Sequence, residues 1–420
     1  MNPLLRRLFV ILAILIGISS TILIGYAYWD QFVDTQDETL TLGEWGTPIT
    51  TAQEFYNFAT KSTSLATDRY FLFNDIDFTG FTWAYNATNN AVTFRGTLDG
   101  NGKTLSNLTI TNNSSTYLYF GIFPRMQGGS VYNLTLSNVN LSLGSTALGG
   151  TSLRAGLIAG NVYGLTNTIQ DITILNCGVR GTSTTGTGGL IGNITTATTV
   201  VHISDIKATG LKVFSKSSSS GGLIGYIGTS GATVTVADVD LQGEVHAYAT
   251  SSYTGGIVGY VISGGKISIN RVVLETTNRN TLETNATYFN RYSQRYLGGI
   301  VGYSLSASAN ILITDAFYTG NLFTQATTRR GDIGTATGRA SATSTRPTLT
   351  RTYYSNVQFS SSTGTIIYTP DVTPTGQMST LVTAAAMPTV TWWNGFFVTF
   401  ASANALWAQD PVTGRPYLIR

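Results

Sequence analysis

A five-residue pattern, glycine-glycine-hydrophobic-hydrophobic-glycine, recurs along the middle of this 420-residue chain. The full copies are GGLIG at 188–192 and 221–225 and GGIVG at 255–259 and 298–302, and a variant, AGLIAG, covers 155–160. The second glycines of successive copies lie 33, 33, 34 and 43 residues apart. A period of about 20 to 50 residues is typical of a solenoid, in which each repeat buries its apolar face against the next.

A second pattern follows roughly 10 to 14 residues further on and reads hydrophobic-x-polar-hydrophobic-x-hydrophobic. Its copies begin at Leu105, Val131, Ile169, Ile203, Val236, Ile269, Ile313 and Leu349. The alternation of apolar and polar residues indicates a strand in every repeat. Together the two patterns predict an all-β fold, a right-handed parallel β-helix (β-solenoid) of about eight coils.

The glycine motif leaves two structural questions open. Glycine is required where the backbone turns with a positive φ angle or where two backbones pass close together. The adjacent apolar residues, such as Leu190 and Ile191, should point to opposite faces of a regular strand. Either the strand bends at the glycines or its outer face is covered.

The third position of the second pattern is polar in every copy. Its residues are Asn107, Asn133, Asp171, Asp205, Asp238, Arg271, Asp315 and Arg351. Carboxylates stacked about 5 Å apart repel each other, so they should face solvent or accept backbone N–H bonds at a turn. We therefore expect a structural ladder with charge pairing around Arg271, and the alternative is an acidic catalytic or calcium site.

Tyrosine follows three successive glycine motifs, at Tyr226, Tyr260 and Tyr303. Because these residues are in register, they should stack as an aromatic ladder. A row of aromatic faces can also bind sugar rings. The three tyrosines are therefore the candidate binding residues of this chain.

Composition excludes nucleic-acid binding and an intramolecular disulfide. Only 11% of residues are charged, the net charge is +3 and no stripe of Lys and Arg appears. The chain therefore lacks the basic surface that binding to nucleic acid requires. The single cysteine, Cys177, excludes an intramolecular disulfide and stands where other repeats carry an apolar residue. It is expected to be a core thiol.

The N-terminus is predicted to direct export. Arg6 and Arg7 precede an apolar run over 8–24, and the run with its flank, 8–29, reaches the length of about 20 residues that spans a bilayer. Cleavage after Ala27 and an uncleaved membrane anchor both fit this segment. As an anchor, it would place residues 30–420 outside the cell, and 26–45 is similar to the N-termini of surface proteins of low-GC Gram-positive bacteria and mollicutes.

Both ends of the solenoid are expected to be covered, since an open terminal coil is an aggregation-prone edge. Thr50 and Thr51 precede 52–58 and predict a short N-capped helix as the N-terminal lid. Aromatic residues in 365–420 are expected to form a C-terminal cap. The predicted organisation is a signal or anchor over 1–29, a linker over 30–46, an N-terminal cap and lead-in segment over 47–95, the solenoid over 96–364 and the C-terminal cap.

The glycine column resembles the GLUG motif of bacterial cell-surface proteins, which also occurs beside the peptidase modules of some streptococcal IgA-cleaving proteins. The segments 70–78 and 94–102 and the closing 406–407 and 415–418 are similar to the ends of those proteins. The resemblance covers about residues 70–420. It implies a parallel β-helix in a cell-surface, adhesin-like setting and implies no catalytic residues.

Enzymatic patterns are lacking. The two histidines, His202 and His246, form no HExxH motif, and no GxSxG elbow occurs. We therefore predict no catalytic residue, metal or cofactor. Three functions remain: a surface binder of a glycan or of a host or neighbour-cell protein, a carbohydrate-active enzyme with carboxylates converging from different coils, and a structural spacer. An insertion over 277–296 is a further place for binding.

Overall fold

The computed structural model describes most of the chain beyond residue 45. The described residues are 46–61, 64–83, 92–112, 119–143, 153–181, 184–215, 219–247, 251–262, 264–280, 294–305, 310–324, 332–340, 347–361 and short pieces at 380–381, 407–409, 411 and 416–418. The chain divides into two compact units, 1–46 and 47–420. The predicted export segment and most of the predicted C-terminal cap lie outside the described residues. Within them, no helix has the length and apolar character to cross a membrane.

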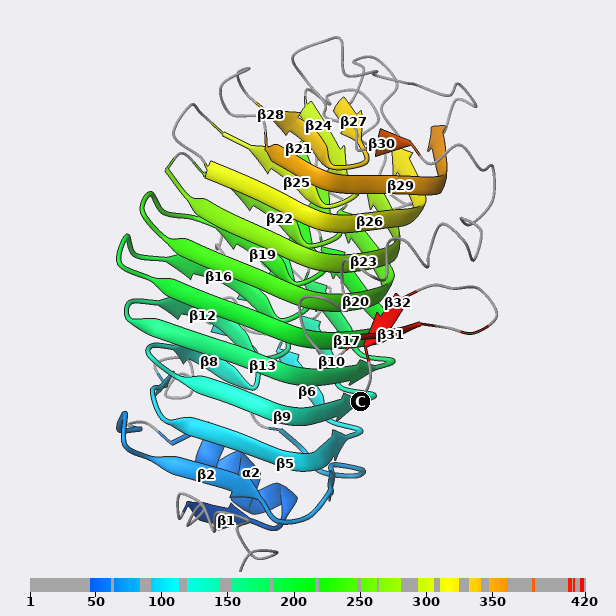
Figure 1. The fold of residues 1–420 in the computed structure, drawn as a ribbon. Coiled ribbons are helices and arrows are strands. Elements are labelled where there is room, and N and C mark those ends of the chain that lie inside the picture. The colour runs from blue at the N-terminus through cyan, green and yellow to red at the C-terminus, as the bar shows by residue number, and fades with distance from the viewer. Residues whose placement is uncertain are drawn as a thin grey trace, which may run out of the picture. The chain divides into compact units, whose positions relative to one another are not determined.

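Three parallel sheets form the second unit (Figure 1). The long sheet runs through β1 (Thr47–Ile49), β2 (Arg69–Leu72), β5 (Thr97–Ser106), β9 (Ser130–Ser137), β13 (Thr166–Leu175), β17 (Val200–Ser215), β20 (Thr233–Ala247), β23 (Lys266–Asn280), β26 (Asn310–Thr324), β29 (Thr348–Ser361) and β30 (Thr380–Leu381). Four shorter strands pair beside this path: β3 (Ile76–Asp77), β6 (Thr109–Asn112), β10 (Asn140–Leu143) and β14 (Gly178–Gly181).

Two sheets of shorter strands complete the coils. The seven-stranded sheet contains β7 (Tyr119–Phe120), β11 (Leu153–Ala155), β15 (Thr184–Gly188), β18 (Ser219–Gly221), β21 (Ser251–Gly255), β24 (Gln294–Gly298) and β27 (Asp332–Gly334). The eight-stranded sheet contains β4 (Thr93–Phe94), β8 (Phe123–Met126), β12 (Ala159–Tyr163), β16 (Ile191–Thr195), β19 (Ile224–Ile227), β22 (Val258–Val261), β25 (Val301–Ser304) and β28 (Thr337–Ala340). A separate antiparallel pair joins β31 (Trp407–Gln409) to β32 (Pro416–Leu418).

Each turn of the solenoid passes through the seven-stranded, the eight-stranded and then the long sheet. In register, Ile203 of β17 pairs with Val236, which pairs with Ile269 and then Ile313. The predicted all-β parallel β-solenoid is confirmed. All three strands are present in the turns that begin at β7, β11, β15, β18, β21, β24 and β27, slightly fewer than the eight coils predicted.

The apolar pair of the glycine motif lies at a bend. Strand β15 ends at Gly188, Gly189 and Leu190 form the bend, and β16 begins at Ile191. Alternation therefore does not continue through the pair, and Leu190 and Ile191 are both fully buried in the core. Of the two explanations left open by the sequence, the bend is the one observed.

Close backbone approach, not a positive φ angle, explains the glycines of the motif. A Cβ atom on Gly188 would lie 2.1 Å from the carbonyl oxygen of Ile191 in the same coil. A Cβ atom on Gly189 would lie 2.0 Å from the carbonyl oxygen of Gly222 in the next coil. One on Gly192 would lie 2.5 Å from the amide nitrogen of Ala155 in the coil before. Real Cβ atoms do not approach backbone so closely, so the three positions tolerate only glycine.

The predicted N-terminal helix is α2, which spans Ala52–Ala59. The Thr51 hydroxyl accepts the Glu54 amide at 3.2 Å as the N-cap, and the Glu54 carboxylate accepts the Thr50 amide at 2.7 Å, one residue before the position that a standard capping box uses. On its buried face, Phe55 packs edge-on against Phe78. The Phe58 ring contacts the rings of Phe94 and Phe123, which belong to β4 and β8.

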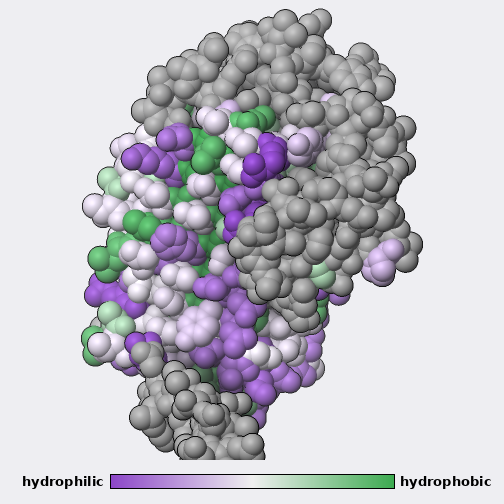
Figure 2. Space-filling model, viewed as in Figure 1, coloured by the Kyte–Doolittle hydropathy of each residue, from purple (hydrophilic) through white to green (hydrophobic). Residues whose placement is uncertain are grey.

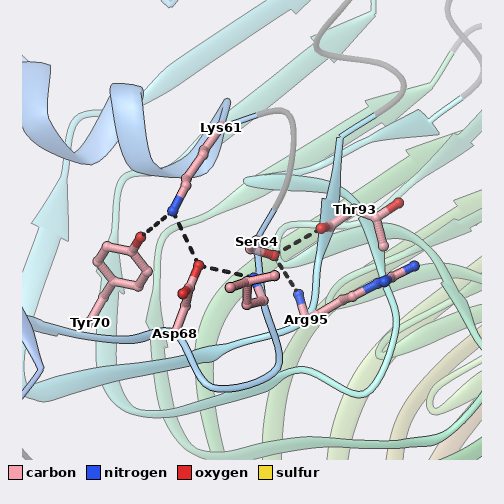
Figure 3. Close-up of polar contacts among 7 residues, drawn as sticks. Lys61, Ser64, Asp68, Tyr70, Thr93 and Arg95 are labelled. Atoms are coloured by element: carbon pink, nitrogen blue, oxygen red, sulfur yellow. Dashed lines mark hydrogen bonds and ion pairs between the residues drawn. The ribbon is translucent and has the colours of Figure 1, made fainter.

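A polar network joins the end of α2 to the first coils (Figure 3). Lys61 Nζ lies 3.1 Å from the Asp68 carboxylate and 3.0 Å from the Tyr70 hydroxyl. The Ser64 hydroxyl donates to the Thr93 carbonyl and accepts the Arg95 amide, at 2.9 and 2.8 Å. These bonds tie the segment after α2 to both β2 and β4.

Candidate functional site

Two columns of side chains flank the glycine bend, one on each short sheet. On the eight-stranded sheet, successive rungs pair Thr93, Arg125, Asn161, Asn193, Tyr226, Tyr260, Tyr303 and Arg339. On the seven-stranded sheet, Tyr119 pairs with Arg154 and Arg154 with Gly186, while higher up Ser219 pairs with Tyr253, Tyr253 with Tyr296 and Tyr296 with Asp332. Among the described side chains of these columns, Arg125 and Arg154 lie towards one end and the tyrosines lie along the middle.

The three tyrosines singled out by the sequence stack face to face. The ring centroids of Tyr226 and Tyr260 are 4.9 Å apart with 9° between the planes. Those of Tyr260 and Tyr303 are 5.2 Å apart with 12° between the planes. Both faces of Tyr260 are therefore covered by tyrosine, which leaves its edge and hydroxyl for contacts with a ligand.

Two further tyrosines join the stack from the opposite column. The Tyr253 ring lies 4.8 Å from Tyr260 and 5.0 Å from Tyr303, and the Tyr296 ring lies 4.6 Å from Tyr303. Sequence reasoning missed both. The available signal was their position two residues before the glycines of their motifs, at Gly255 and Gly298.

The outer part of the tyrosine cluster is available for hydrogen bonding. The rings of Tyr226 and Tyr260 are partly exposed, and neither hydroxyl hydrogen-bonds to any residue that the structure describes. Partial burial raises the pKa of Tyr226 above its usual value. It also raises the pKa of Tyr260, and the neighbouring tyrosines raise that pKa further. Both hydroxyls stay protonated at neutral pH and can donate as well as accept.

The residues of the polar ladder share an unusual backbone conformation. Asn133, Asp171, Asp205, Asp238, Arg271, Asp315 and Arg351 all have φ angles between 45° and 56°. Asparagine and aspartate adopt this left-handed region more readily than other non-glycine residues, whereas arginine is uncommon there. The column therefore marks a repeated kink in the strands of the long sheet.

The prediction that Asn107 is the first member of this column was wrong. The structure pairs Leu98 with Val131 and Leu105 with Leu136, so the pattern that begins at Leu105 is not the equivalent of the one at Val131. Asn107 instead belongs beside Asn138, whose side chain donates to it at 2.8 Å. Both columns place asparagine in the left-handed region, which made the two patterns look alike.

Charge pairing in the described part of the ladder includes two separate ion pairs. Arg271 binds Asp238 through two hydrogen bonds of 2.7 and 2.6 Å. Arg351 binds Asp315 in the same two-point manner, with Nη2 at 2.8 Å from Oδ2. Each arginine thus pairs with the aspartate of the coil before it.

Figure 2 shows hydrophilic residues gathered in a band that crosses the stacked strands of the long sheet, with others scattered beside it. Asp171 and Asp205 are part-exposed, and Asp205 accepts hydrogen bonds from Gln170 and Ser204. Among the described residues, no three His, Cys, Asp or Glu side chains gather closely enough to hold a metal ion. The insertion residues 281–293 lie outside the described part of the chain.

No protein-family model matches the chain, and no curated protein sequence matches it. Among solved structures, one similar chain is described as a "putative immunoglobulin A1 protease from Bacteroides ovatus". It superposes with a TM-score of 0.52 at 15% sequence identity, and the match covers 90% of this chain and 93% of that one. At such low identity the likeness shows the fold alone, and the shared feature is the β-solenoid.

Proposed function

We propose that this chain is an exported, surface-displayed β-solenoid that binds a glycan without cleaving it, in an adhesin-like role. The observation that carries the proposal is the pair of hydroxyls on Tyr226 and Tyr260. They lie on consecutive rungs, have no hydrogen-bond partner among the described residues and stand on partly exposed rings. Tyrosine offers an apolar edge and a polar tip together, which suits the mixed surface of a sugar.

The packing of the cluster supports binding by a rigid surface. Tyr260 is held between Tyr226 and Tyr303, and Tyr253 contacts it from the opposite column. Side chains already fixed in place lose little conformational entropy when a ligand binds. The rungs repeat along the solenoid, so the surface suits a ligand that also repeats along its length.

Surface display is proposed from the N-terminal segment. Residues 8–29 would carry the solenoid across the membrane, either as a cleaved signal or as a lasting anchor. The resemblance of the glycine motif to that of GLUG-motif surface proteins supports the same setting.

A glycan array probed with the full chain tests the proposal. We expect binding that falls about threefold to tenfold for each hydroxyl removed in Tyr226→Phe and Tyr260→Phe, because a neutral hydrogen bond contributes on that scale. Tyr132→Phe, a part-exposed tyrosine of the long sheet, is the matched control. Mass spectrometry of the recovered glycan should show it intact.

Two results would count against this function. One is a bound glycan whose affinity survives the change of Tyr226, Tyr260 and Tyr303 together to Ala in a folded protein. The other is a shortened or unsaturated glycan after incubation, which would favour a carbohydrate-active enzyme.

A further inference from the structure

The cationic end of the two columns is built around one tyrosine. The Arg125 guanidinium carbon lies 4.6 Å from the centre of the Tyr119 ring, and that of Arg154 lies 5.2 Å from it. Arg154 Nη1 also donates to the Tyr119 hydroxyl at 2.9 Å. Two permanently charged groups thus share one aromatic ring.

Neither arginine has a counter-charge among the residues that the structure describes. Among the described residues, no carboxylate forms an ion pair with Arg125 or Arg154. Their ladder neighbours Thr93, Asn161 and Gly186 are uncharged. The ion pairs at Arg271 and Arg351 show that the solenoid does place acids beside arginines where the pairing is structural.

Each guanidinium is buried at its Nε atom and has terminal nitrogens that are open to a ligand. The Nε atoms of Arg125 and Arg154 are buried and have no hydrogen-bond partner in the part of the chain that the structure describes. Both Nη groups of Arg125 and the Nη2 group of Arg154 are not buried and bond to no residue that the structure describes. A buried N–H group without an acceptor is unfavourable, and an anion that accepts from the open terminal nitrogens would also offset the two positive charges.

We infer that Arg125 and Arg154, held by Tyr119, form a subsite for the anionic group of an acidic glycan, a carboxylate or a sulfate. The inference deepens the proposed function and rests on it. Arg154 pairs with Gly186, and a Cβ atom on Gly186 would lie 3.0 Å from the Cβ atom of Tyr226, so the subsite lies beside the tyrosine cluster and one ligand can engage both. Arginine presents a fork that matches both kinds of oxyanion through paired hydrogen bonds.

Pairs of ligands that differ in one anionic group distinguish the contribution of that group to the affinity from the contribution of the sugar. Titration calorimetry of the full chain uses sialyllactose against lactose, oligogalacturonate against its methyl ester, and a sulfated against an unsulfated oligosaccharide. We expect the charged member to bind at least about tenfold more tightly and the difference to shrink as salt rises. The uronate, sialate and sulfate arms identify the source of the anionic group.

Variants then assign the effect to these side chains. Arg125→Gln and Arg154→Gln should each remove most of the preference for the charged ligand, with thermal unfolding as the check on folding. Tyr119→Phe keeps the ring and loses the Arg154 anchor, so it should weaken the preference less. Arg180→Gln, at an exposed arginine on β14 of the long sheet, should leave it unchanged.

The outcomes also separate the inference from the function it extends. Equal affinity for charged and uncharged members, or a preference that survives both arginine variants, overturns the anionic subsite. Binding of neutral sugars that depends on Tyr226 and Tyr260 would still support the proposed function. Absence of binding in every arm overturns both.

Discussion

At the scale of single residues, glycine is the most constrained choice in this chain. The last glycine of each motif approaches the amide of the coil before it, and a Cβ atom on Gly225, Gly259 or Gly302 would lie 2.4, 2.6 or 2.6 Å from a backbone nitrogen. The sequence showed that these positions repeat. It could not show which of the two reasons for glycine applied, because that depends on how closely the two short sheets pack.

Gly225→Ala is expected to destabilise the protein because the new methyl group meets the backbone of Thr187. Overpacking of this kind costs about 1–3 kcal/mol, and rigid backbone on the receiving side should place the loss at the upper end of that range. Urea unfolding followed by circular dichroism measures it. Gly80→Ala is the control, since nothing lies within 4 Å of that Cβ and only its φ of 76° opposes the change. An equal loss in both variants would contradict the steric explanation.

Cys177 is expected to be unreactive in the native protein. Burial raises the pKa of its thiol to about 11, and the sulfur contacts the backbone at Val139 and Leu136. A thiol reagent at pH 8 should therefore label only urea-unfolded chains, because the thiolate is the nucleophile. Rapid labelling of the folded protein would contradict this.

The same pKa shift gives a dependence of stability on pH. Between the unfolded thiol pKa of about 8.5 and the folded value of about 11, the unfolded chain has lost a proton that the folded chain keeps. The contribution of Cys177 is therefore fully present below the lower value and is lost as pH rises towards the upper one, by about 1.4 kcal/mol per pH unit. Cys177→Ala should lose less stability than the wild type between pH 8.5 and 10.5.

At the scale of elements, the polar column of the long sheet combines a backbone kink with two ion pairs. Aspartate and asparagine suit the left-handed backbone, but Arg271 and Arg351 do not, so their side chains have a separate reason to be there. The carboxylates of Asp238 and Asp315 are almost completely buried, and the arginines neutralise them.

Arg271→Asp tests the pairing. It places a third carboxylate between Asp238 and Asp315, and removal of one partner from a buried pair costs about 3–5 kcal/mol, somewhat less here because Arg271 is partly exposed. Arg271→Asn is the matched control because asparagine has the same size and backbone preference without the charge. We expect the melting temperature to fall more for aspartate than for asparagine. No loss in Arg271→Asp would argue against a paired ladder.

The sequence predicted the elements better than it predicted the site. Register within the long sheet followed from the repeated apolar pattern, because a slip by one residue would expose the core face. The register of the first coil could not be predicted in this way, because Gly100, Asn101 and Gly102 interrupt the regular pattern between Asp99 and Lys103. The interruption hides the equivalence of this coil to the later copies.

The sequence also did not reveal four residues of the candidate sites, Tyr253, Tyr296, Arg125 and Arg154. Their roles arise from contact across two sheets, which no spacing along one strand reveals.

At the scale of the solenoid, stability depends on both the stack and its covered end. Each coil contacts only its neighbours, so a terminal coil has half the partners of a central one. The helix α2 lies at the N-terminal end of the stack beside β1 and β2 (Figure 1). Its aromatic face replaces the coil that would otherwise continue the core.

Phe55→Ala should uncover this end. Phe55 is fully buried and its ring meets those of Phe58, Phe78 and Trp83, so loss of the ring should destabilise the protein by about 3–5 kcal/mol. Thermal unfolding with light scattering measures both consequences, a lower melting temperature and earlier aggregation through the exposed strand edge. Gln53→Ala, at an exposed position of the same helix, controls for changes in helix propensity. If Phe55→Ala lowers stability without bringing aggregation forward, the helix contributes packing energy alone and the edge is protected by other residues.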